Sequence, residues 1–108
     1  MKTTMRILAI AFALASTVTA ASAAEVVITQ KDKAFQPAEV TIHPGDTLVF
    51  KNEDPVNHNV FSETKGLDFV IKSQKPGESG NVTLTGEGTT EVRCAFHPAM
   101  KLNVTVKK

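Results

Sequence analysis

The stretch TTEVRCAFHPAMKLNVTV, residues 89–106, carries the strongest structural signal in this 108-residue chain. Its two flanks, Thr89–Cys94 and Leu102–Val106, alternate apolar and polar residues, as β-strands with one buried face do. Between them Cys94, His97 and Met100 recur at every third position. A strand would send neighbouring side chains to opposite faces, so this spacing indicates a loop that curls around one point. The stretch therefore predicts two strands joined by a loop that carries three potential metal-binding side chains.

The rest of the chain repeats the β pattern without any long segment of helical period. Short β-type segments separated by turn residues occupy Val26–Thr29, Val40–Ile42, Thr47–Lys51, His58–Phe61, Phe69–Ile71 and Asn81–Thr85. The stretch 62–80, rich in Lys, Ser, Gly and Pro, is the least regular. Short strands at fairly even spacing predict an all-β fold, a Greek-key β-sandwich of seven to eight strands.

The N-terminus has the features of an export signal. Lys2 and Arg6 precede a nine-residue apolar run at 7–15, and small residues follow up to Ala23 and Ala24. The run is shorter than the roughly 20 apolar residues that cross a bilayer, so an uncleaved anchor is the less favoured interpretation. We predict a cleaved secretory signal peptide at 1–24, cut after Ala23 or Ala24, and one domain at 25–108. We expect export to the periplasm and no membrane insertion after cleavage.

Charge and cysteine content exclude two classes of protein. The chain has 12 Lys and Arg against 11 Asp and Glu, a net charge of +1. Lys2 and Arg6 leave with the signal, so the mature chain has 10 Lys and Arg against 11 Asp and Glu, a net charge of −1. A charge this close to zero argues against a nucleic-acid binder. A single cysteine excludes an intrachain disulfide. A lone thiol in an oxidising compartment is a liability unless something occupies it, and a metal ion is one such occupant.

The ligand types favour copper. Thiolate and thioether suit Cu(I), imidazole serves both oxidation states, and a His₂Cys set with a weak axial Met is typical of electron-transfer copper sites. Such a set needs a second imidazole, and His58, 36 residues before Cys94, is the candidate. Asn59 follows it, where its backbone or side chain can hold the ligand loop or hydrogen-bond the cysteine sulfur.

Other interpretations of these residues remain open. Zinc could use Cys94, His58 and His97, although a thioether has no purpose there. A Cys–His nucleophilic dyad lacks an obvious orienting third group. Met100 could instead fill the core where loop and strand meet. His43, in a Pro-Gly-Asp turn, is expected to be an exposed bystander.

The two ligand motifs together resemble a known family. Asn57-His58-Asn59-Val60, followed by Cys94-x-x-His97-Pro98-x-Met100, resembles the cupredoxins, the small type 1 blue copper proteins. Within the plastocyanin, pseudoazurin and amicyanin group it is most similar to amicyanin. The resemblance extends upstream to Phe35-x-Pro37, Val40-Thr41-Ile42 and Gly45–Phe50. It departs from the amicyanin pattern at Val92, Phe96 and Ala99, which are positions near the partner-docking surface.

The resemblance implies a Greek-key sandwich with one copper ion at one end. His58, Cys94, His97 and Met100 would be its ligands. The implied function is not enzymatic: a monomer would shuttle single electrons by Cu(II)/Cu(I) cycling. Its partners would be redox proteins such as a periplasmic dehydrogenase or a c-type cytochrome. The alternative is a periplasmic copper-binding protein for tolerance or delivery, which the lack of a Met- or His-rich tract disfavours.

Overall fold

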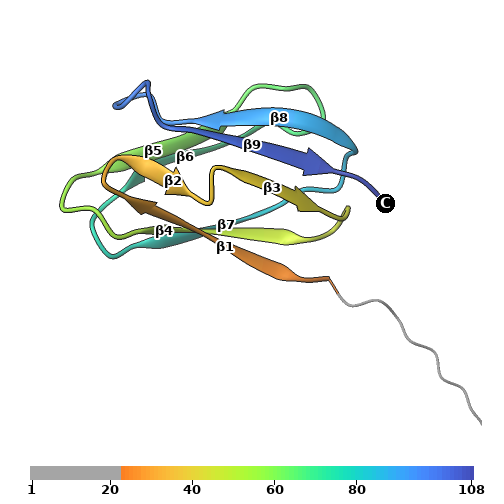
Figure 1. The fold of residues 1–108 in the computed structure, drawn as a ribbon, viewed down its shortest axis with the longest axis horizontal. Coiled ribbons are helices and arrows are strands. Elements are labelled where there is room, and N and C mark those ends of the chain that lie inside the picture. Colours follow the sequence, from red (N-terminus) through yellow and green to blue (C-terminus); the bar gives the residue numbers. More distant parts are fainter. Residues whose placement is uncertain (1–22) are drawn as a thin grey trace, which may run out of the picture.

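The computed structural model describes residues 23–108, which form strands joined by turns and loops (Figure 1). Most of the predicted signal peptide, 1–22, lies outside these described residues. Within them, no helix is long and apolar enough to cross a membrane. The strands are β1 (Glu25–Lys31), β2 (Ala34–Gln36), β3 (Glu39–Ile42), β4 (Thr47–Asn52), β5 (His58–Ser62), β6 (Phe69–Gln74), β7 (Ser79–Thr83), β8 (Gly88–Arg93) and β9 (Lys101–Val106).

The strands form two sheets that pack as a sandwich, which confirms the predicted all-β class (Figure 1). One sheet has the order β2-β1-β4-β7 and the other β3-β9-β8-β5-β6. The pairs β1–β4 and β3–β9 are parallel, and the other pairs are antiparallel. Parallel neighbours cannot be joined by a tight turn, so each of these pairs brings together segments that are distant in the chain.

The described residues contain nine strands rather than the seven or eight predicted, and the unpredicted strand is β2. It forms a hairpin with β1 in which Lys31 pairs with Ala34, so the turn consists of Asp32 and Lys33 alone. Both turn residues have positive φ, 55° and 53°. Such two-residue turns usually contain glycine, and its absence here removes the sequence signal for a hairpin.

The core lies between the sheets and follows the period-2 pattern of the strands. In β9 the side chains of Leu102, Val104 and Val106 are buried while their neighbours are more exposed. The fully buried Phe50 of β4 packs against the rings of Phe35 and Phe69, at centroid distances of 6.1 and 5.8 Å. These inward faces fix the register of the strands from which the candidate ligands emerge.

The two ends of the sandwich carry different segments. The loop between β8 and β9 lies at the same end as the β4–β5 connection, and the β3–β4 turn lies at the opposite end (Figure 1).

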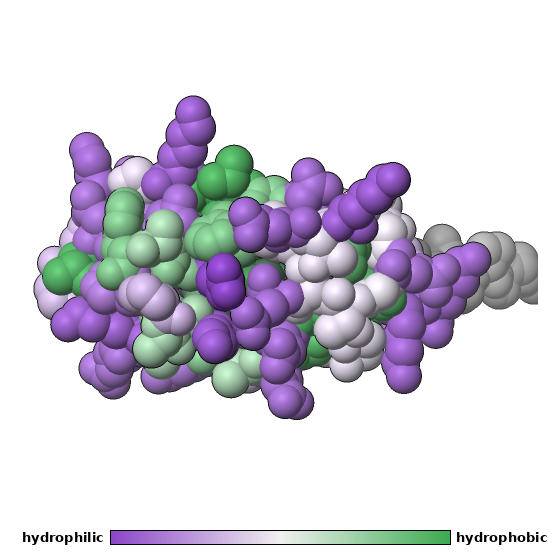
Figure 2. Space-filling model, turned by 90° about the horizontal axis from the view of Figure 1, so that it is seen from above, coloured by the Kyte–Doolittle hydropathy of each residue, from purple (hydrophilic) through white to green (hydrophobic). Residues whose placement is uncertain are grey.

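Seen from above, hydrophilic side chains cover most of the surface, with apolar side chains in patches between them (Figure 2). Among residues 23–108, three large apolar side chains are more than half exposed: Val27, Val70 and Phe96.

Candidate metal centre

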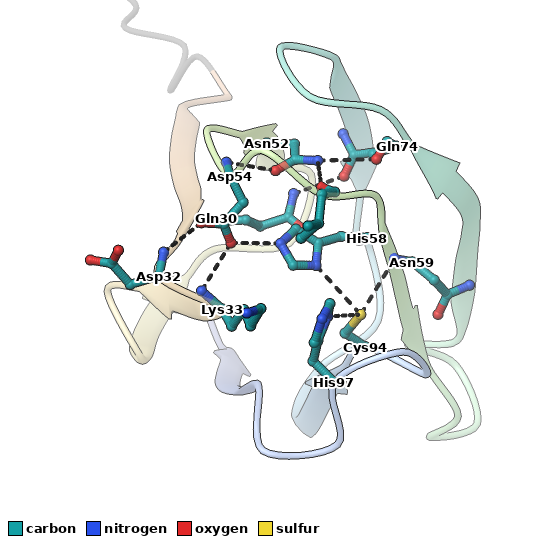
Figure 3. Close-up of polar contacts among 11 residues, drawn as sticks. Gln30, Asp32, Lys33, Asn52, Asp54, His58, Asn59, Gln74, Cys94 and His97 are labelled. Carbon is teal, nitrogen blue, oxygen red and sulfur yellow. Dashed lines mark hydrogen bonds and ion pairs between the residues drawn. The ribbon is translucent and has the colours of Figure 1, made fainter.

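Three of the four predicted ligands meet at one end of the sandwich (Figure 3). His58 opens β5, whereas Cys94 follows β8 and His97 lies in the loop beyond it. Their ligand atoms all lie within 4.8 Å of one another, and the Cys94 Sγ is 3.8 Å from the Nδ1 of each histidine. A sulfur and a nitrogen at that separation can both reach one ion at metal–ligand distances of about 2.0–2.3 Å.

Met100 closes the loop that bears Cys94 and His97. Its amide donates a hydrogen bond of 2.9 Å to the His97 carbonyl, and its side chain is 1% exposed. Residues 94–100 thus leave the sheet at the end of β8, turn through His97 and re-enter the core directly before β9. The expected curl around one point is present, and the thioether as a fourth ligand stays a prediction.

The two imidazoles differ in their access to solvent. The His58 side chain is completely buried and Cys94 is 1% exposed, whereas His97 is half-buried. The two rings meet edge to face at a centroid distance of 4.9 Å. The cluster therefore has a dry inner side at His58 and one solvent-facing ring, that of His97.

Asp54 is the functional residue that the sequence prediction missed. Its Oδ2 lies 2.7 Å from the Nε2 of His58, the ring nitrogen that faces away from Cys94 (Figure 3). The same carboxylate accepts the amide N–H groups of Asp32 at 2.6 Å and Lys33 at 2.9 Å. Asp54 thus ties a candidate ligand to the β1–β2 hairpin turn. The only sequence signal was an acid four residues before His58, in what reads as an ordinary polar turn.

These contacts settle the ionisation of Asp54 and the tautomer of His58. Burial acts to raise the pKa of Asp54, but the hydrogen bonds from His58, Lys33 and Asp32 outweigh it and leave the pKa below its ordinary value of 3.8. The carboxylate is therefore ionised at neutral pH and can only accept hydrogen bonds. The Nε2 of His58 is then the donor in this contact, so a neutral ring carries its proton there and has its Nδ1 lone pair on the side of Cys94. A carboxylate in this position orients a metal-binding histidine and raises its basicity.

Asn59 joins the sheet to the ligand loop in both of the predicted ways. Its amide donates to the Cys94 Sγ at 3.4 Å, and its side-chain Oδ1 accepts the Ala95 amide at 3.3 Å. The pairing of β5 with β6 is irregular between His58 and Val60, which places this residue at a bulge. Hydrogen bonds of this kind orient the residues that bind a metal ion and tune the site.

A buried layer of amides lies behind Asp54 and His58. Asn52 donates from Nδ2 to the carbonyls of Val56 and Gln74, and its Oδ1 accepts the Asp54 amide at 2.9 Å. Gln74 accepts a side-chain hydrogen bond of 2.8 Å from Gln30. Asp54 is thus held by Asn52, and His58 lies opposite Gln74 in the pairing of β5 with β6.

His43 lies away from the cluster, as expected. It belongs to the β3–β4 turn, at the opposite end of the sandwich, and its side chain is 77% exposed. Its ring is 3.7 Å from the Asp46 carboxylate.

The donor set fits copper better than the alternatives. A thiolate and two imidazoles also suit zinc, but the buried Met100 that closes the same loop adds a soft donor that matches copper. A nucleophilic Cys94 would need to meet a substrate, and at 1% exposure it does not. Of the interpretations considered for the described residues, only a copper site gives a role to Cys94, His97 and Met100 together.

Comparisons with known proteins agree with this geometry. A family profile described as a cupredoxin-like domain matches residues 4–106. The chain is 39% identical over 75 residues to a chloroplastic plastocyanin of Fritillaria agrestis, across 59% of this chain and 45% of the relative. It is 28% identical over 109 residues to the methylamine utilization protein MauL of Methylorubrum extorquens, across 98% of this chain and 96% of the relative. The chain spans about half the length of the chloroplastic plastocyanins it matches.

Solved structures show the same fold. A reduced variant of amicyanin superimposes with a TM-score of 0.68 at 27% identity, across 76% of this chain and 81% of the other.

Proposed function

The chain belongs to the cupredoxin-like family, whose members bind one copper ion, and from this premise we propose that it carries single electrons between redox proteins. We propose His58, Cys94, His97 and Met100 as the ligands of that ion. The proposal rests on one observation above all: a thiol and two imidazoles from segments 36 residues apart converge within 4.8 Å. The copper supplies the redox change, from Cu(II) to Cu(I) and back.

The surrounding residues keep the ligand atoms in place in both redox states. Asp54 fixes the His58 ring through a 2.7 Å hydrogen bond, and Asn59 fixes Cys94 through the sulfur and the next amide. His58 and Cys94 are both buried beside packed strands, which excludes water from the inner side of the site. A site whose ligands are held in this way needs little rearrangement when an electron arrives or leaves.

His97 offers the route by which electrons enter and leave. Its ring is the one candidate ligand among the three that reaches solvent, and the neighbouring Phe96 is 54% exposed. The loop residues around the half-buried ring, Ala95, Phe96, Pro98 and Ala99, are apolar and exposed. Such a surface suits short-lived docking, since transient redox complexes use small interfaces.

We place this carrier in the periplasm as a monomer, with a c-type cytochrome or a dehydrogenase as partner. The basic start, apolar run and small residues of the first 24 positions support export. The similarity to amicyanin over most of the described domain supports a redox partner in general. We propose a carrier rather than an enzyme because four protein ligands would leave no open position for a substrate.

A copper titration tests the ligand assignment. Cu(II) added to the purified protein is expected to give an intense visible band from thiolate-to-copper charge transfer, saturating at one ion per chain. A colourless one-to-one complex would refute a type 1 site.

Voltammetry and electron exchange test the carrier role. We expect a reversible one-electron wave and rapid oxidation or reduction by a periplasmic c-type cytochrome. A blue protein that binds copper tightly but exchanges electrons slowly would instead support copper tolerance or delivery.

A further inference from the structure

A second buried carboxylate, that of Asp46, lies at the end of the sandwich opposite the candidate metal centre. Asp46, in the β3–β4 turn, is only 5% exposed although it carries a carboxylate. Its Oδ2 accepts the His43 amide at 2.9 Å, and its Oδ1 accepts the backbone N–H of Ala24 at 2.9 Å. This second contact spans 22 residues and reaches the junction between the predicted signal and the domain.

The charge of Asp46 lacks a matching cation in the described chain. The amide of Ala24, followed by that of His43, holds the pKa of Asp46 below its ordinary 3.8, so the group is ionised at neutral pH. Among the described residues, the one ion-pair contact of Asp46 within 4 Å is with the His43 ring, at 3.7 Å; this ring is largely exposed and carries a charge only when it is protonated. Glu25, which follows Ala24 in the chain, is an acid, and the amide of Lys107 donates to the Ile42 carbonyl beside His43.

The fold engages both backbone polar groups of Ala24. Besides its N–H on Asp46, its carbonyl accepts the Thr47 amide at 2.9 Å, directly before the parallel β1–β4 pairing begins. Ala23 and Ala24 are both exposed and precede β1, so it is the two backbone contacts that mark Ala24. A cut after Ala24 would remove both contacts, whereas a cut after Ala23 would keep them.

We propose that the mature protein begins at Ala24 and that its α-ammonium group forms an ion pair with the Asp46 carboxylate. Hydrolysis of the Ala23–Ala24 peptide bond adds one water, which leaves a carboxylate on Ala23 and an ammonium on Ala24. A neutral N–H···O⁻ contact at 2.9 Å becomes a charge-assisted one at a position that the fold already sets. The small residues Ala21 and Ala23 supply the A-x-A pattern for this cut.

The inference rests on the proposed export, and one preparation tests both. The full chain is expressed in a Gram-negative host, and the product is recovered from the periplasm and weighed by intact-mass spectrometry. A mass that begins at Ala24 supports the inference. A mass that begins at Glu25 overturns it and leaves export intact, whereas an uncleaved chain overturns both.

The ion pair is tested on the same product by titrating the Ala24 α-amino group by NMR. We expect its pKa to lie above the ordinary range of about 7.7–8.0 in the folded protein and to return to that range in urea. Asp46→Asn should lower it, and Glu25→Gln, which removes a nearby carboxylate without this contact, should change it less. An ordinary pKa in the folded wild-type protein overturns the ion pair, whether or not the Asp46→Asn variant folds.

Discussion

Asp54→Asn is the most informative single change at the metal centre. Both carboxylate oxygens accept hydrogen bonds: Oδ1 from the Asp32 amide, and Oδ2 from the Lys33 amide and the His58 ring. An asparagine in either orientation would point its NH₂ group at one of these donors. The variant therefore loses at least one hydrogen bond and brings two donors together.

We expect this variant to differ from the wild type in two quantities, its thermal stability and its copper affinity. A buried donor left without an acceptor costs about 1–3 kcal/mol, which lowers the Tm of the metal-free protein by roughly 4–8 °C per kcal/mol in a domain of this size. Loss of the group that orients a metal-binding histidine typically lowers metal affinity about 10–100-fold. Because the His58 side chain is fully buried, water cannot replace the lost carboxylate.

Asp46→Asn is the matched control. Asp46 is also 5% exposed, also accepts two backbone N–H groups and also lies beside a histidine, but it is at the far end of the sandwich. Copper affinity is measured by competition with a chelator of known affinity, and stability by thermal unfolding of the metal-free proteins. We expect both variants to be less stable and only Asp54→Asn to bind copper more weakly. Equal copper affinities in the two variants would show that Asp54 has a purely structural role.

Four further outcomes are expected. Cys94→Ser should abolish the visible band and the rise in Tm on adding copper, and an unchanged spectrum would remove Cys94 from the site. His43→Ala should leave the spectrum unchanged, because the ring lies at the other end of the molecule; a lost band would contradict this. Met100→Leu should keep a visible band and raise the reduction potential measured by voltammetry, since the loss of a donor destabilises Cu(II) more than Cu(I); an unchanged potential would argue against axial ligation. The lowered pKa of Asp46 means that its carboxylate stabilises the fold above its unfolded pKa and ceases to do so as pH falls through the folded pKa. The Tm of Asp46→Asn should therefore lie below that of the wild type at neutral pH and approach it as the pH falls through the folded pKa of Asp46, and a gap that persists in acid would refute this.

Local pattern was sufficient to predict the β class and most strands. Alternation identified β9 and β8 to within a residue at each end, because one face of each is buried. It did not identify β2, which has three residues and follows a turn without glycine. It also could not give the parallel pairings, which depend on packing between segments far apart in the chain.

The residues proposed as ligands could be identified from the sequence, but Asp54, which contacts the His58 ring, could not. Cys94, His97 and Met100 share one loop with regular spacing, and His58 carries a motif with Asn59. Asp54 gains its role only because the β1–β2 turn folds over it and supplies two amides. The signal for that contact is divided between two segments more than 20 residues apart, neither of which is unusual alone.

The place of β9 in its sheet has a consequence for the order of assembly. Strand β9 lies between β3 and β8, so the five-stranded sheet lacks an interior member until residues 101–106 are in place. The loop that brings His97 and Met100 is complete only when β9 follows it into place. We therefore expect copper capture and closure of the sheet to depend on the same event, the docking of β9 between β3 and β8. A chain that ends before residue 101 would lose the interior of one sheet, and with it the strand that holds the metal-binding loop.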